Sequence, residues 1–127
     1  MRVIRIETTE GHGLFQSGKA HEVMGWKPYA MSPPDEDAAL QWDRTEHDGP
    51  MYFACTWAQF RLWVGREDAC HMMVDNGLIL TVLDVTHADP HVGSEQVTYR
   101  KMQAAVLCCF FPDTPWGELE AFIEGDV

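Results

Sequence analysis

The sequence lacks the features that mark a membrane, secreted or disordered protein. No apolar run approaches the ~20 residues that span a bilayer, so we expect no membrane association. Residues 1–11 alternate charged and apolar side chains, which is unlike a signal peptide. There is no internal repeat and no low-complexity tract, and 46% of the 127 residues are hydrophobic. These absences predict a folded, soluble, cytoplasmic protein.

Basic residues are scarce. Nine Lys and Arg stand against 20 Asp and Glu, a formal net charge of −11, and residues 102–127 hold five acids and no base. Neutralising phosphates requires a basic surface, so we expect no direct nucleic-acid binding. The acidity is explained either by solubility or by attraction to a basic surface on another protein, and both explanations stay open at this point.

The four cysteines do not form the pattern of a disulfide framework. Cys108 and Cys109 are adjacent with apolar flanks, while Cys55 and Cys70 fall in predicted helices or strands. In a reducing cell we expect all four to be small buried hydrophobic side chains. None has a glycine-rich flank or basic neighbours that would favour a reactive thiolate, so no cysteine nucleophile is indicated.

Residues 51–64 carry the strongest local signal that is present. The apolar, β-inclined run 51–55 predicts a short buried strand. Thr56 is followed three residues later by Gln59, the spacing of a helix capping box. Large apolar residues then recur on one helix face, which predicts a helix that packs on a sheet. They are Trp57, Phe60, Trp63 and Val64.

Two further segments predict long strands. Residues 3–8 alternate, with Ile4 and Ile6 facing the core and the odd-numbered positions facing the other side. Residues 78–85 (LILTVLDV) are nearly all apolar, which is typical of a strand buried on both faces at the centre of a sheet.

The remaining segments complete the predicted fold. Residues 95–100 predict a strand antiparallel to 78–85, and residues 67–74 a short helix. Residues 102–111 begin with helix formers and end with strand formers, so both structures stay open. Thr114 as N-cap and Pro115 as first helical residue predict an acidic C-terminal helix over 115–124.

Together these segments predict a single α+β domain over residues 1–127. We expect a mixed or antiparallel sheet of four to six strands, packed by two or three helices. Residues 24–50 form a Pro-rich acidic loop with one short helix near 35–42. So long an irregular segment is usually functional, and its aromatic residues are costly to leave in water. They are Trp26, Tyr29 and Trp42, candidates to line a nucleotide or small-ligand pocket.

His87 and His91, with Asp84 and Asp89 beside them, are the weak candidates for metal ligands. Two histidines four residues apart share one face of a helix. Pro90 lies between them, however, and the segment favours a turn. A polar loop is the favoured interpretation, and we expect no metal.

The sequence resembles short proteins, without assigned chemistry, that tailed bacteriophages encode. The resemblance rests on the opening strand VIRIE (3–7), the G-x-G-aromatic turn at 11–15, the block FACTWAQFRLW (53–63) and the strand QVTY (96–99), with a Pro-rich acidic loop between. It covers residues 1–105. It implies a small phage accessory protein in the host cytoplasm, a class that includes inhibitors of host defence.

A second pattern is similar to that of ADP-ribosyltransferases. These enzymes have an Arg or His on a first strand, a Ser or Thr at a strand-to-helix step, and a Glu or Gln on a later strand. Arg5, Thr56 and Glu95 or Gln96 occupy those places in order. The resemblance implies NAD as cofactor, held by Arg5 and Thr56, with the carboxylate stabilising positive charge at the ribose.

Three functional hypotheses follow. The preferred one is a phage accessory protein with no cofactor that binds a basic host protein surface, with the oligomeric state open. The others are a small NAD-dependent enzyme and a module that sequesters a nucleotide. In the preferred hypothesis the acidic residues make the binding surface. These are Asp35, Glu36, Asp37, Asp43, Glu46, Asp48, Glu118, Glu120 and Glu124.

Overall fold

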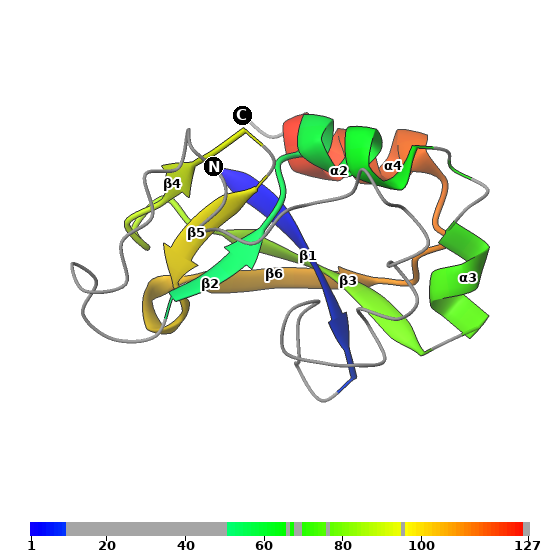
Figure 1. Cartoon of the computed structure of the whole chain (residues 1–127), viewed down its shortest axis with the longest axis horizontal. Coiled ribbons are helices and arrows are strands. Elements are labelled where there is room, and N and C mark those ends of the chain that lie inside the picture. The colour runs from blue at the N-terminus through cyan, green and yellow to red at the C-terminus, as the bar shows by residue number, and fades with distance from the viewer. Residues whose placement is uncertain (10–50, 66, 68–69, 76, 95, 126–127) are drawn as a thin grey trace.

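The computed structural model describes residues 1–9, 51–65, 67, 70–75, 77–94 and 96–125. In this part of the chain two three-stranded antiparallel sheets pack with three α-helices (Figure 1). This confirms the predicted α+β class. The predicted loop at 24–50 and its short helix lie outside the described residues.

The first sheet has the order β1-β3-β6. Its central strand β3 (Leu78–Asp84) pairs on one side with β1 (Arg2–Thr8) and on the other with β6 (Ala105–Phe110). Leu80 and Val82 of β3 are buried on the helical face, and Thr81 and Leu83 are buried on the opposite face. The prediction of a central strand buried on both faces is therefore confirmed.

The second sheet has the order β2-β5-β4. Its strands are β2 (Met51–Ala54), β5 (Val97–Arg100) and β4 (His91–Val92). The prediction that 95–100 pairs with 78–85 is wrong, because β1 and β6 already occupy both edges of β3. Backbone hydrogen bonds of 2.8 and 2.7 Å between Ile4 and Cys55 join the two sheets.

The first sheet is a middle layer with a core on each face. Helices α2 (Trp57–Val64) and α4 (Trp116–Glu124) lie on one face (Figure 1), and the second sheet packs against the other. The core under the helices includes Ile4, Ile6, Phe60, Trp63, Leu80, Val82, Leu119 and Ile123. The core under the second sheet includes Val3, Ala54, Leu83, Val85, Val97 and Tyr99.

Helix α2 begins as its sequence predicts. The Thr56 hydroxyl accepts from the Gln59 amide at 3.1 Å, and the Thr56 amide donates to Gln59 Oε1 at 3.0 Å. This reciprocal pair satisfies two amide donors at the helix start. At the other end Gly65 adopts φ 85, a left-handed conformation that glycine reaches without steric cost.

Helix α4 does not begin as predicted. Pro115 is the N-cap residue, no side-chain bond comes from Thr114, and the helix starts at Trp116. Its first amide donates instead to Glu67 Oε1 at 3.1 Å. A carboxylate at a helix N-terminus is favourable because the unsatisfied amides there carry partial positive charge. The short helix α3 spans Cys70–Asp75, later than the predicted 67–74.

The ambiguous segment 102–111 resolves into a 3₁₀ turn, η4 (Lys101–Gln103), followed by β6. Cys55 and Cys70 are buried as predicted, and burial raises the pKa of the Cys55 thiol to about 12. The prediction is wrong for Cys108, which is partly exposed, and for Cys109, which is exposed. β6 pairs only with β3 among the described strands, so its outer side carries no neighbour there.

Candidate functional site

The acidic face of α4 is the most distinctive charged surface of the described chain. Leu119 and Ile123 point into the core at i, i+4 spacing, while Glu118, Glu120 and Glu124 are exposed. From Met102 to Gly125 the chain carries no basic residue. The carboxylates therefore create a negative potential that no cation on their own element offsets.

A shallow hollow of about 410 Å³ lies along this face. Two of its five lining residues are the acids Glu120 and Glu124. The other three are small, and a Cβ added at Gly117 would meet nothing within 4 Å. A partner backbone or side chain can therefore approach α4 closely beside the carboxylates. The small lining residues are Gly117, Ala121 and Gly125.

The core side of α4 is fixed by specific contacts. The Trp57 indole N–H donates to Glu120 Oε2 at 3.1 Å. Trp116 packs edge-on against the rings of Trp57 and Phe60, with centroids 5.6 and 5.9 Å apart. Arg2 Nη1 donates to the Phe122 carbonyl at 2.6 Å. These contacts hold the backbone in place, so the acidic face is presented on a rigid element. Glu120 is partly used in this way, whereas no described contact holds the carboxylates of Glu118 or Glu124.

The other predicted acidic residues and the predicted ligand pocket lie outside the described residues. The structure therefore brings together only the α4 part of the predicted binding surface. The residues outside are Asp35, Glu36, Asp37, Asp43, Glu46, Asp48, Trp26, Tyr29 and Trp42.

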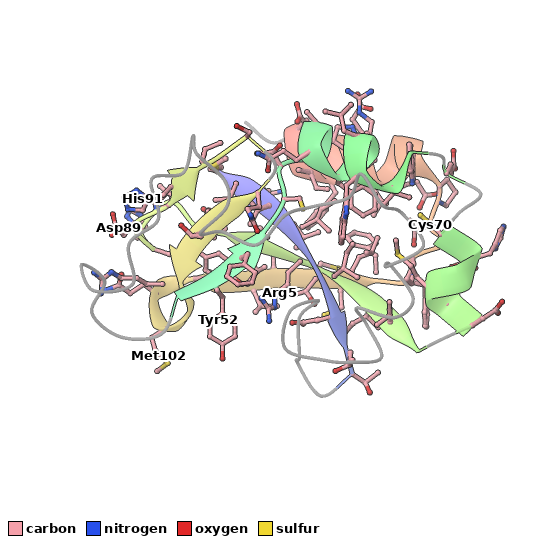
Figure 2. All side chains as sticks on the ribbon, viewed as in Figure 1. Arg5, Tyr52, Cys70, Asp89, His91 and Met102 are labelled. Carbon is pink, nitrogen blue, oxygen red and sulfur yellow. The ribbon has the colours of Figure 1, made fainter. Side chains whose placement is uncertain are left out.

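Arg5 lies in a polar cluster between the two sheets, beside Tyr52 (Figure 2). Its Nε donates to Glu7 Oε2 at 2.9 Å and its Nη1 to the Phe53 carbonyl at 3.0 Å, and its side chain is 5% exposed. The Thr81 hydroxyl donates to the second Glu7 oxygen. Sequence reasoning missed this cluster, although Glu7 follows Arg5 at the two-residue spacing that places both on one strand face.

The other residues of the NAD hypothesis also have positions within the fold. The Thr56 hydroxyl is used in the α2 cap. Gln96 is fully buried, and Glu95 lies outside the described residues. The backbone of Cys55, the residue before Thr56, pairs with that of Ile4, the residue before Arg5. Arg5 and Gln96, however, expose almost no surface. The described geometry indicates structural roles for them.

Among the predicted metal residues, His91 and Asp89 contact each other, and Asp89 also contacts Arg100. His91 Nε2 lies 3.3 Å from Asp89 Oδ1, and Arg100 Nε lies 3.6 Å from Asp89 Oδ2. The hydrogen bond from His91 lowers the pKa of Asp89. Asp84 contacts Thr86 and Met1 instead. No group of three or more possible metal ligands occurs among the described residues, which include His87.

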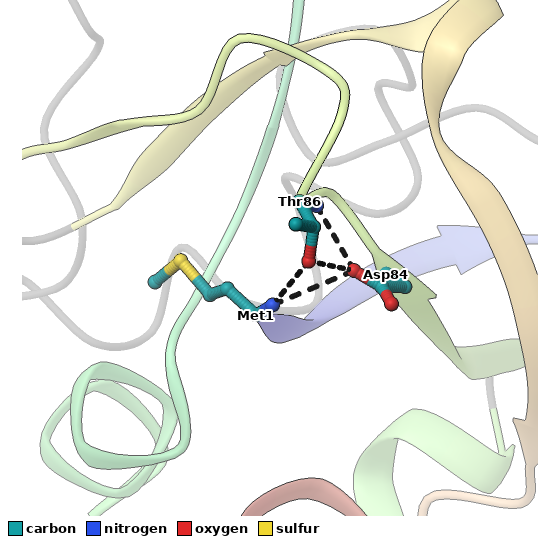
Figure 3. Close-up of polar contacts among 3 residues, drawn as sticks. All are labelled: Met1, Asp84 and Thr86. Carbon is teal, nitrogen blue, oxygen red and sulfur yellow. Dashed lines mark hydrogen bonds and ion pairs between the residues drawn. The ribbon is translucent and has the colours of Figure 1, made fainter.

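Asp84 instead ties the start of β1 to the end of β3 (Figure 3). Its Oδ1 accepts from the Thr86 hydroxyl at 2.5 Å and the Thr86 amide at 2.9 Å. The Met1 ammonium donates to Thr86 Oγ1 at 2.6 Å and lies 3.4 Å from Asp84 Oδ1. Chiefly through the Thr86 hydroxyl, these bonds lower the pKa of Asp84 to about 2.

Comparison with known proteins gives one family. The family model described as bacteriophage T4 Y00F protein matches residues 1–111, which ends before α4. No curated protein and no solved structure matches the chain. Among the described helices, none has the length and apolar character that a membrane crossing requires.

Proposed function

Because the chain belongs to the bacteriophage T4 Y00F protein family, we propose that this phage accessory protein acts in the host cytoplasm by binding a basic host protein. The binding surface includes the acidic face of α4. The acidic residues of 35–48 lie outside the described residues and are proposed as further binding residues. Occupation of the partner's basic surface would inhibit that partner.

The observation that supports the proposal is the hollow on α4, where small residues and carboxylates lie side by side. A basic segment of a partner can place its backbone over Gly117 and Ala121 and its Lys or Arg side chains beside Glu120 and Glu124. Opposite charges across such a surface raise the association rate and select against acidic partners. The rigid core contacts of α4 lower the entropy cost of docking.

The test is capture of host proteins from lysate by the full chain, followed by mass spectrometry. The decisive variant carries Glu118→Lys and Glu124→Lys, which reverses two exposed charges and leaves the Trp57–Glu120 hydrogen bond in place. Asp75→Lys on α3 is the matched control, because Asp75 is exposed and lies on another helix.

We expect a specific host protein to be captured by the wild type and by Asp75→Lys, and lost with the double variant. Capture should also weaken steeply with added salt, because exposed charges are screened beyond roughly 8 Å at physiological ionic strength. Capture that changes neither with charge reversal nor with added salt would contradict the proposal. So would a wild type that captures no host protein.

A further inference from the structure

We infer that two copies of this chain associate through the outer edge of β6, forming a two-fold symmetric dimer that is separate from the acidic face of α4. The inference goes beyond the proposed function, since it assigns a second interaction surface and its occupant. It rests on exposure, on charge and on the pairing of β6.

The first observation is a cluster of exposed apolar side chains on and beside β6. Met102 is 83% exposed, Val106 63%, Leu107 39% and Phe111 72%, and we call these four residues the β6 edge patch. Met102 points away from the ribbon where the chain enters the strand (Figure 2). Exposed apolar residues gathered within ten positions mark an interaction surface more often than scattered ones do.

The second observation is the backbone of the strand. In the described sheet β6 pairs only with β3, so its outer edge presents amide and carbonyl groups to whatever lies beside it. Edge strands that must stay single commonly carry Lys, Pro or inward-pointing charges. The residues Ala105–Phe110 contain none of these. Their one irregularity is a β-bulge where Leu83 pairs with Val106 and Val82 with Cys108, leaving Leu107 as the additional residue.

The third observation is the distribution of charge, which favours a second copy as the occupant. Residues 102–112 carry no charged side chain, in a chain with a net charge of −11. Two such acidic chains repel each other, and the repulsion is weakest where they meet through an uncharged segment. The run is also flanked by opposite signs, with Arg100 and Lys101 before it and Asp113 after it.

Antiparallel pairing of two β6 strands uses this asymmetry. A two-fold axis beside Leu107 sets the bulge of one copy opposite the bulge of the other. It also places Val106 opposite Cys108 of the second copy. The same axis brings the Asp113 end of each strand to the Arg100–Lys101 end of the other. The surface is thus self-complementary, as a two-fold dimer requires, and antiparallel strands pair without a connecting segment.

The size of the patch predicts a weak dimer. One short strand and four apolar side chains per copy bury less than the roughly 1,200 Å² of a standard stable interface. We therefore expect a dissociation constant on the order of micromolar or weaker. The acidic face of α4 is the outer side of a helix that lies on one face of the first sheet, and it takes no part in the pairing.

The experiment is sedimentation velocity of the full chain from about 1 µM to about 1 mM, under reducing conditions so that Cys108 and Cys109 form no disulfide. The wild type should shift from monomer to dimer across this range. Val106→Lys should raise the dissociation constant at least tenfold, because it places two ammonium groups at the paired edge. Asp113→Lys should weaken the dimer too, because it sets like charges at each end of the pair.

Leu62→Lys is the control, because Leu62 is 77% exposed on α2 and lies outside the patch. It should dimerise like the wild type, and circular dichroism checks that each variant is folded. A wild type that stays monomeric at the highest concentration would overturn the inference. So would a dimer that Val106→Lys and Asp113→Lys leave unchanged.

Discussion

Single residues with the strongest chemical character mostly hold the fold together. Arg5 illustrates this, because its guanidinium is shared between the Glu7 carboxylate and the Phe53 carbonyl and lies over the Tyr52 ring. A buried cation needs such partners to remain charged. Nearby, burial raises the pKa of the Tyr99 phenol to about 12. The cluster therefore joins the two sheets rather than presenting a reactive group.

The α2 capping box yields a prediction at this scale. Thr56→Ala should lower the free energy of unfolding by about 1 kcal/mol, because the Gln59 amide loses its acceptor. Thr114→Ala is the control and should change it by no more than about 0.5 kcal/mol, since Thr114 does not cap α4. Urea unfolding measures both. Equal losses for the two variants would show that the caps are misassigned.

Asp84 yields a prediction on pH. Its pKa is lowered from 3.8 to about 2 in the folded protein, first by the Thr86 hydroxyl. A lowered pKa stabilises the fold above the unfolded value and loses that contribution as the pH falls through the folded value. The stability difference between wild type and Asp84→Asn should thus be constant above about pH 5, decrease as the pH falls through 3.8 and vanish at about pH 1. We expect it to be small, since the side chain is 41% exposed.

Urea midpoints of both proteins across this pH range provide the measurement. A difference that grew as the pH fell would have the wrong sign for a lowered pKa and would refute the assigned hydrogen bonds.

Among the elements, helix α4 has a core side and an outer side with different roles. It closes the helical core with Leu119 and Ile123, receives its N-terminal acceptor from Glu67 and binds Arg2 through the Phe122 carbonyl. The acidic face is the other side of the same helix. A residue change on the core side therefore acts on stability and one on the outer side acts on recognition.

Leu119→Ala tests the core side. Leu119 is fully buried, so truncation leaves a cavity and should lower the free energy of unfolding by about 3 kcal/mol. Leu62→Ala removes an exposed leucine from α2 and should change it by no more than about 0.5 kcal/mol. Thermal or urea unfolding followed by circular dichroism compares them. A small effect of Leu119→Ala would mean that α4 packs only loosely on the sheet.

At the scale of the whole molecule, acidity and apolar exposure are segregated. Three of the four carboxylates of 102–125 lie on α4, whereas the β6 edge patch carries no charge. The two proposed surfaces should therefore be separable: Val106→Lys leaves host-protein capture intact, and the Glu118→Lys, Glu124→Lys variant still dimerises. The family match ends at residue 111, so it covers β6 and leaves α4 outside.

The sequence by itself determined those parts of the protein whose interactions lie within a few residues. The capping box of α2 and the buried strand β3 are of this kind, because a hydrogen bond between positions 56 and 59 and a run of apolar residues are both local patterns. The acidic outer face of α4 follows in the same way from helical spacing.

Only the tertiary structure decided which segments meet. It paired β5 with β2 and β4, supplied the α4 acceptor from Glu67, 49 residues away, and left Cys109 on an exposed strand. Strand pairing and burial depend on competition between segments that are far apart in the chain. Apolar sequences such as 105–110 suit the centre and the edge of a sheet equally well. No local pattern in the sequence shows that β1 and β6 occupy the two edges of β3.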